Sequence, residues 1–136
     1  MTTETEKIKV HPNWLRFMFA VNIFVVGGFG LALLIGGQAT FTYFGFPTEE
    51  MIMTGYALSV MVAYAIMGII GMRFPVKFAP VLLMQATGKI VWFLAVIIPQ
   101  LATGSLPTFS VMLIATFIPL IIGDLIAVPW KYLFAK

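Results

Sequence analysis

Lys89 and Asp124 are the two full charges that lie well inside otherwise apolar, membrane-length segments. A charge in the hydrocarbon core costs about 2.5 kcal/mol or more on insertion scales, so a paired or functional role is expected for each. At 1.5 Å of rise per residue, they lie about 15 Å and about 10 Å from the same predicted end of their helices. A lysine side chain covers that difference, so we expect Lys89 and Asp124 to form a pair.

Four uncharged polar or aromatic side chains are expected in the same layer as this pair. Gln85 lies one helical turn below Lys89 on the same face, and Trp92 lies one turn above it. Tyr64 of the second apolar segment and Asn22 of the first segment fall at a similar depth. Each of the four segments therefore contributes at least one hydrogen-bonding side chain to this layer.

Three interpretations of the layer are open at this point. In the first, which we favour, the pair locks the third and fourth segments together. In the second, the layer lines a polar cavity that binds a small molecule. In the third interpretation the two do not meet: Lys89 extends to the headgroups, and Asp124 pairs with Lys131, two turns further along the same face.

Residue types that carry most enzyme chemistry are scarce in this chain. It has no cysteine, and its single histidine, His11, belongs to the polar N-terminal tail. Asp124 is the single acid within an apolar segment, so paired-carboxylate catalysis has no second member. We therefore expect no catalytic residues, no metal site and no autonomous enzyme, with a quinone or a lipid as conceivable ligands.

The elements that hold this layer are four apolar stretches of membrane-spanning length. Hydrophobic residues make up 61% of the 136 residues and charged residues only 10%, whereas soluble domains are nearer a quarter charged. The sequence predicts an all-α membrane protein, an antiparallel bundle of four transmembrane helices in a single domain. The predicted spans are 14–37, 51–72, 79–102 and 108–133, and a polar tail covers 1–13.

The breaks between these spans contain turn-forming and polar residues. The first break, 38–50, is predicted to be a loop rich in Phe and Tyr, with Thr48 starting the next helix and Glu49 and Glu50 in its first turn. Pro75 and Pro107 mark the other two breaks, and Pro99 and Pro119 are expected to kink the last two spans.

The basic residues predict the orientation of the bundle. Seven of the eight flank the spans on one side, and the other two loops carry none. Loops rich in Lys and Arg stay in the cytoplasm, so both termini and the middle loop are predicted to be cytoplasmic. This placement also excludes nucleic acid as a partner. The seven residues are Lys7, Lys9, Arg16, Arg73, Lys77, Lys131 and Lys136.

Small residues recur at every fourth position in the first two spans, and such stripes let helix backbones approach closely in lipid. We expect the two stripes to pack against each other within the monomer, and the alternative is a seam between copies of the chain. The stripes are Gly28, Ala32 and Gly36 in the first span, and Gly55, Ser59 and Ala63 in the second.

In size and layout the chain resembles the small four-helix bacterial membrane proteins known as DoxX-like. Leu15-Arg16 opens the first span, and Gly27-Gly28-Phe29-Gly30 gives this span its Gly-rich character. The second span departs from the resemblance, because it has no acidic residue. Members of that family include a quinone-linked oxidoreductase subunit, so the resemblance implies an accessory role near a redox complex in a bacterial cytoplasmic membrane.

Taken together, these features predict a non-catalytic accessory or scaffold subunit of the membrane, either oligomeric or associated with a larger complex. Its expected partners are membrane lipids and other spans. The alternative is a binding protein or transporter for a small apolar or amphipathic molecule, such as a quinone. In that alternative Lys89 contacts a carbonyl or an anionic group, Asp124 holds the lysine, and Trp92 and Tyr64 line the walls. An ion path ranks last, because the other half of every span is nearly free of ionisable groups.

Overall fold

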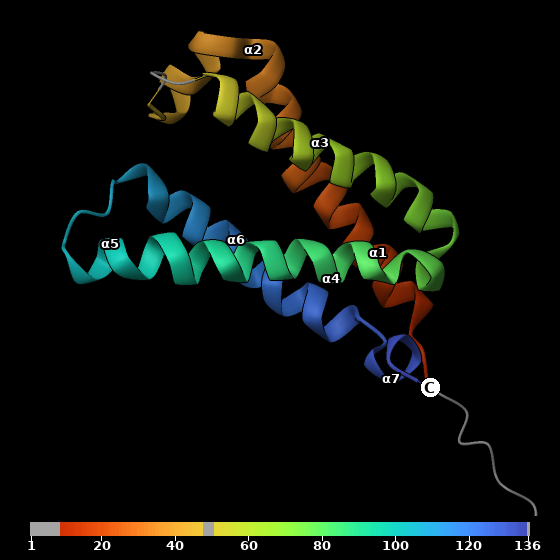
Figure 1. The fold of residues 1–136 in the computed structure, drawn as a ribbon. Coiled ribbons are helices and arrows are strands. Elements are labelled where there is room, and N and C mark those ends of the chain that lie inside the picture. The colour runs from red at the N-terminus through yellow and green to blue at the C-terminus, as the bar shows by residue number, and fades with distance from the viewer. Residues whose placement is uncertain (1–8, 48–50, 136) are drawn as a thin grey trace, which may run out of the picture.

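The computed structural model describes residues 9–47 and 51–135, and every regular element in these two ranges is a helix. Four of the helices are long and apolar enough to cross a membrane, so the predicted all-α membrane architecture is confirmed at this level (Figure 1). They are Pro12–Phe44, Met51–Arg73, Pro75–Ala102 and Phe109–Ala127.

Two of the four spans contain π-helical turns that divide them into named elements. The first comprises α1 (Pro12–Asn22), the π-turn η1 (Ile23–Gly27) and α2 (Gly28–Phe44). The second span is α3 (Met51–Arg73). The third comprises α4 (Pro75–Trp92), the π-turn η2 (Phe93–Ile97) and α5 (Ile98–Ala102). The fourth is α6 (Phe109–Ala127), and a short helix α7 (Trp130–Leu133) follows it.

The first span is longer than its predicted end at residue 37, because the helix bends at Gly37 and continues to Phe44. Gly37 has φ +52°, a backbone conformation that glycine adopts readily. Most of the segment predicted as an aromatic loop is therefore helical, and Phe41 packs beside Leu33 and Leu58 in a small apolar cluster. The predicted helix start at Thr48, with its two glutamates, lies outside the described residues.

Prolines set two other helix ends that differ from the prediction. The third span begins at Pro75 and not at residue 79, because a proline at the first helical position loses no intrahelical hydrogen bond. The fourth span ends at Ala127 and not at residue 133. Val128 is extended there, with φ −62° and ψ 123°, as is usual for a residue before proline, here Pro129.

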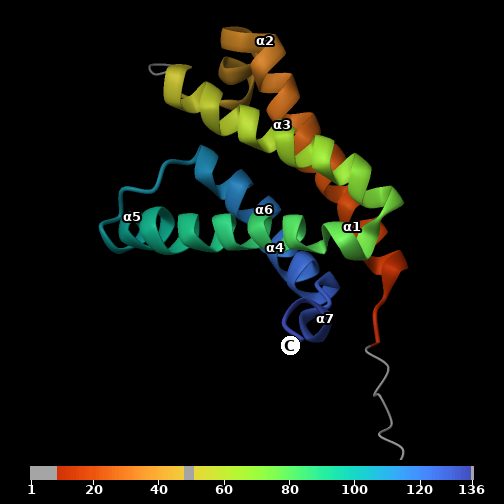
Figure 2. The ribbon, with the colours of Figure 1, turned by 45° about the vertical axis from the view of Figure 1, so that its right-hand side comes forward.

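The helix α1 packs against α3, α4 and α6, so it occupies the centre of the bundle. Successive spans run in opposite directions. The start of α1, the α3–α4 turn and α7 lie at one end of the molecule, and the α2–α3 and α5–α6 connections lie at the other (Figures 1 and 2). That the first of these ends is cytoplasmic stays a prediction based on the basic residues. Arg16 Nε donates a hydrogen bond of 3.2 Å to the carbonyl of Met72 at this end.

The seam between the first two spans is built by glycines other than the predicted ones. A Cβ atom at Gly27 would collide with the side chain of Ala65, and one at Gly71 would lie 2.6 Å from the ring of Phe19. Gly68 similarly leaves room for Ile23. These positions bring the backbones together as small residues do in lipid.

The expectation that the two small-residue stripes pack against each other within the monomer is therefore wrong. Open space surrounds the positions that Cβ atoms would take at Gly28 and Gly55. The rest of the two stripes, Ala32, Gly36, Ser59 and Ala63, is exposed on the outside of the bundle.

Candidate functional site

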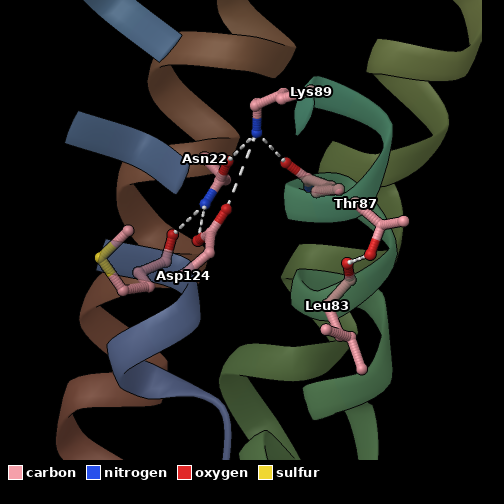
Figure 3. Close-up of polar contacts among 7 residues, drawn as sticks. Asn22, Leu83, Thr87, Lys89 and Asp124 are labelled. Atoms are coloured by element: carbon pink, nitrogen blue, oxygen red, sulfur yellow. Dashed lines mark hydrogen bonds and ion pairs between the residues drawn. The ribbon is translucent and has the colours of Figure 1, made fainter. Parts of the chain in front are cut away.

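Lys89 of α4 and Asp124 of α6 meet in the interior of the bundle (Figure 3). Lys89 Nζ lies 3.7 Å from Asp124 Oδ2, and the carboxylate is fully buried, whereas Lys89 keeps 8% of its surface exposed. The predicted pair is confirmed, and Lys89 points into the bundle, toward Asp124. Its partner lies on the next span along the chain, so the pair ties α4 to α6.

Asn22, the last residue of α1, connects the two charges. Its Nδ2 donates one hydrogen bond of 2.8 Å to Asp124 Oδ1 and another of 2.9 Å to the carbonyl of Met18 on its own helix. Its Oδ1 accepts a longer bond of 3.5 Å from Lys89 Nζ. The Asn22 amide therefore uses both of its hydrogens and its oxygen, and it fixes the position of the carboxylate.

Lys89 has two further neighbours. Gln85 Oε1 accepts a hydrogen bond of 3.1 Å from Lys89 Nζ, as their spacing of one turn predicts. The ring of Phe117 lies 5.7 Å from the same nitrogen, within the range of a cation–π contact. By contrast, Asp124 Oδ2 has no hydrogen-bond donor among the described residues. A buried carboxylate oxygen without a donor calls for a specific explanation.

A cavity of about 340 Å³ lies between α3 and α4 beside this network. Helix α4 contributes Lys89, Gln85 and Trp92 to its wall, and α3 contributes Tyr64. Four of the six predicted layer residues therefore share one cavity, while Asn22 and Asp124 lie behind Lys89. The other lining residues are Val26, Tyr56, Ala57, Val60, Met61, Gly88 and Phe117.

The mouth of the cavity lies on the outer surface of the bundle. Helices α3 and α4 are joined by the turn at Phe74 and diverge from there, as the two views in Figures 1 and 2 show. Three lining residues are exposed: Tyr56 and Ala57 of α3, with 68% of the surface of Tyr56 accessible, and Gly88 of α4. In a chain whose outer surface faces lipid, this mouth opens toward the bilayer.

A second cavity of about 130 Å³ adjoins the first, and Val26, Met61 and Phe117 line both. Almost all of its wall is apolar. The residues that line only this second cavity are Val25, Phe29, Phe44, Met112, Leu113 and Thr116. A polar end and an apolar end thus lie next to each other inside the bundle.

Sequence reasoning missed three lining residues that periodicity could have indicated. Phe117 lies seven residues before Asp124 on α6, and Tyr56 lies eight residues before Tyr64 on α3, so each pair shares a helix face. Gly88 lies one turn before Trp92 on the same face of α4. What the sequence does not reveal is that α3 and α4 diverge and leave a space between these faces.

Both π-turns begin next to site residues. Turn η1 starts directly after Asn22, and η2 starts directly after Trp92. Such turns interrupt the regular α-helix and are frequent at functional sites. They change the direction in which the following residues point. Residues at regular helical spacing before and after a π-turn therefore do not lie on one continuous face.

The arrangement combines an ion pair, amide groups and aromatic rings, which is a set suited to binding. No group of three or more His, Cys, Asp or Glu residues that could hold a metal ion occurs within 9–47 and 51–135. Trp92 lies against Phe117, with ring centroids 5.5 Å apart in an edge-to-face arrangement. Such a site can bind a molecule with a hydrogen-bond acceptor at one end and a flat or apolar body.

Comparisons with known proteins give no match for this chain among family models, curated proteins or solved structures. The resemblance to DoxX-like proteins therefore stays a prediction.

Proposed function

We propose that this chain is an integral membrane protein that binds a small amphipathic molecule in the cavity between α3 and α4. The observation that carries the proposal is the placing of Lys89 in the wall of a cavity of about 340 Å³ that opens on the outer surface of the bundle. Ligand sites are typically concave and mainly apolar, with a few fixed polar groups that orient the ligand, and this cavity has that composition.

The network behind Lys89 supports a binding role because it holds the ammonium group in place. Asp124 compensates the charge of the lysine, and Asn22 fixes the carboxylate through the bond of 2.8 Å. An ammonium group that is already held loses little freedom when a ligand binds, so the site is preorganised. The polar head of the ligand then lies at Lys89, between Trp92 and Tyr64.

The smaller cavity offers a place for the apolar part of the ligand. It adjoins the larger one at Val26, Met61 and Phe117, and its wall is almost wholly apolar. A molecule with its head at Lys89 extends its tail past Phe117 into this space, which buries the tail away from the headgroup region. Quinones and single-chain lipids have this shape.

The second candidate function is the accessory or scaffold role, as an oligomer or beside a larger complex of a bacterial cytoplasmic membrane. The observation that favours it is the stripe of Gly28, Ala32 and Gly36, which is exposed on the outside of the bundle among the residues that the structure describes. Stripes of this kind support close helix contacts between chains in lipid.

Native mass spectrometry of protein extracted gently from its own membrane tests both functions with two reciprocal variants. Gly88→Leu fills the mouth of the cavity without a clash, because nothing lies within 4 Å of the position of a Cβ there. Gly28→Leu adds the same side chain on the exposed stripe, where the space is equally open.

The binding proposal predicts a small molecule bound in stoichiometric amount to the wild type and to Gly28→Leu but lost from Gly88→Leu. The accessory proposal predicts partner chains that Gly28→Leu loses and Gly88→Leu keeps. A wild-type protein that carries no small molecule, or a Gly88→Leu variant that retains it fully, contradicts binding in this cavity.

A further inference from the structure

We infer that the cavity selects an uncharged, planar carbonyl head group over an anionic one. The inference rests on the proposed binding function and names its chemical class of ligand. It follows from the charge balance around Lys89, from the distances to its partners, and from the rings that line the cavity.

The charge balance of the buried layer is already complete. Lys89 and Asp124 carry one positive and one negative formal charge and lie 3.7 Å apart. A carboxylate or phosphate ligand at Lys89 would leave this layer with an excess negative charge, away from water, and such a charge is strongly disfavoured inside a membrane. A carbonyl oxygen accepts a hydrogen bond and leaves the net charge unchanged.

The distances around Lys89 Nζ leave room for such a bond. An ammonium group has three hydrogens, and its one short contact is the bond of 3.1 Å to Gln85. Asn22 Oδ1 is at 3.5 Å and the carboxylate oxygen at 3.7 Å. Because Lys89 also lines the cavity, a hydrogen that now points toward these weak partners can turn to a ligand carbonyl. Asp124 still compensates the charge at that distance.

The rings around the cavity favour a flat head group. Trp92 of α4 meets Phe117 of α6 edge to face, and Tyr56 and Tyr64 of α3 line the same cavity. A planar conjugated carbonyl can bury both of its faces against such rings while its oxygen points to Lys89. A saturated chain gains no comparable directional contact there.

Two sources could supply this carbonyl, namely a free amphiphile such as an aryl ketone or quinone, or the ester group of a membrane lipid. Both present the same uncharged acceptor to Lys89, so the test must separate them.

The test compares two probes of nearly equal shape, para-octylacetophenone and para-octylbenzoate, which differ in the charge of the head group. Trp14 and Trp130 are replaced by Phe, so that Trp92 is the single remaining tryptophan and its emission reports binding. The ketone is titrated directly, and the benzoate is measured by its displacement of the ketone, so one signal serves both. The same titrations are repeated with Asp124→Asn, which removes the negative charge.

We expect the ketone to bind the wild-type site about tenfold or more tightly than the benzoate, since an unpaired charge in a membrane interior costs at least that factor. In Asp124→Asn the uncompensated lysine should prefer the benzoate. If the wild type binds the benzoate as tightly as the ketone or more tightly, the charge selectivity is wrong, although the binding function stands. If neither probe binds, the binding function itself fails.

Added lipids then identify the source of the carbonyl. Displacement of the ketone by ester-linked but not by ether-linked phosphatidylcholine assigns the site to lipid esters. No displacement by either lipid assigns it to a free amphiphile. Equal displacement by both would show that the carbonyl is not what the site recognises, and would overturn the inference.

Discussion

Asn22 and Asp124 join the first span to the last through a buried hydrogen bond of 2.8 Å, although 102 positions separate them in the sequence. The bond lies where α1, α4 and α6 meet, because Lys89 of α4 contacts both residues. The three helices are thereby held in one register.

Replacing Asn22 by Leu should destabilise the bundle. The change removes the donor of a hydrogen bond to a charged group, which is worth about 1.5–3 kcal/mol. Thermal unfolding in detergent micelles measures the effect. Thr87→Val serves as the control, because the Thr87 hydroxyl donates to the carbonyl of Leu83 on its own helix and the residue is exposed (Figure 3). Equal unfolding midpoints for both variants would contradict a structural role of Asn22.

Removing both charges should be tolerated better than removing either one. Lys89→Met leaves a buried carboxylate without its counter-charge, and Asp124→Leu leaves a buried ammonium group without its own. Each single variant is expected to lose about 3–5 kcal/mol of stability. The double variant removes both penalties, so its free energy of unfolding should lie closer to that of the wild type than either single variant does. Additive losses in a double-mutant cycle would show that the two charges act independently.

The double variant also distinguishes a purely structural role of the pair from a role in ligand binding. A pair that only locks α4 to α6 predicts that the folded double variant still carries the ligand of the wild type. The proposed binding site predicts that the ligand is lost although the protein is folded, because Lys89 holds the head group. Mass spectrometry of the intact variant distinguishes these results.

Two neighbouring glycines should respond differently to the same small substitution. At Gly27 a Cβ would collide with Ala65, whereas at Gly28 it meets open space. Gly27→Ala is expected to force η1 and α3 apart and to cost about 1–3 kcal/mol, as overpacking usually does. Gly28→Ala should leave the unfolding midpoint unchanged or raise it slightly. The reverse order would show that the seam runs along the other face of the helix.

The orientation of the chain is open to direct measurement, because the natural sequence has no cysteine. Ser105→Cys places a thiol in the α5–α6 connection, and Ala135→Cys places one near the C-terminus. Both positions are exposed. With both termini in the cytoplasm, a membrane-impermeant maleimide added to intact cells should label residue 105 and spare residue 135 until the cells are lysed. The opposite pattern would overturn the predicted orientation.

The four spans and the Lys89–Asp124 pair could be predicted from the sequence because both follow from the cost of placing polar groups in hydrocarbon. The length of each apolar stretch locates a helix. Two opposite charges at similar depth lower the cost of burial by forming an ion pair. The bend at Gly37 could not be predicted in the same way, since the hydrophobicity of the sequence does not show where a helix changes direction.

The packing of the first two spans was predicted incorrectly for a related reason. Regular spacing shows which small residues share a helix face, but it does not show which face meets the neighbouring helix, and both spans carry glycines on more than one face. The seam runs through Gly27 and Gly30, and the stripe that begins at Gly28 faces outward.

The lipid-facing mouth between Tyr56 and Gly88 has a consequence for how affinity should be expressed in the proposed site. A ligand that arrives from the bilayer partitions into the lipid first, so its mole fraction in the membrane, and not its concentration in water, governs occupancy. Adding more lipid at a fixed amount of ligand dilutes it and should lower the bound fraction by mass action. Two amphiphiles of equal intrinsic affinity would then differ in apparent potency by the ratio of their partition coefficients.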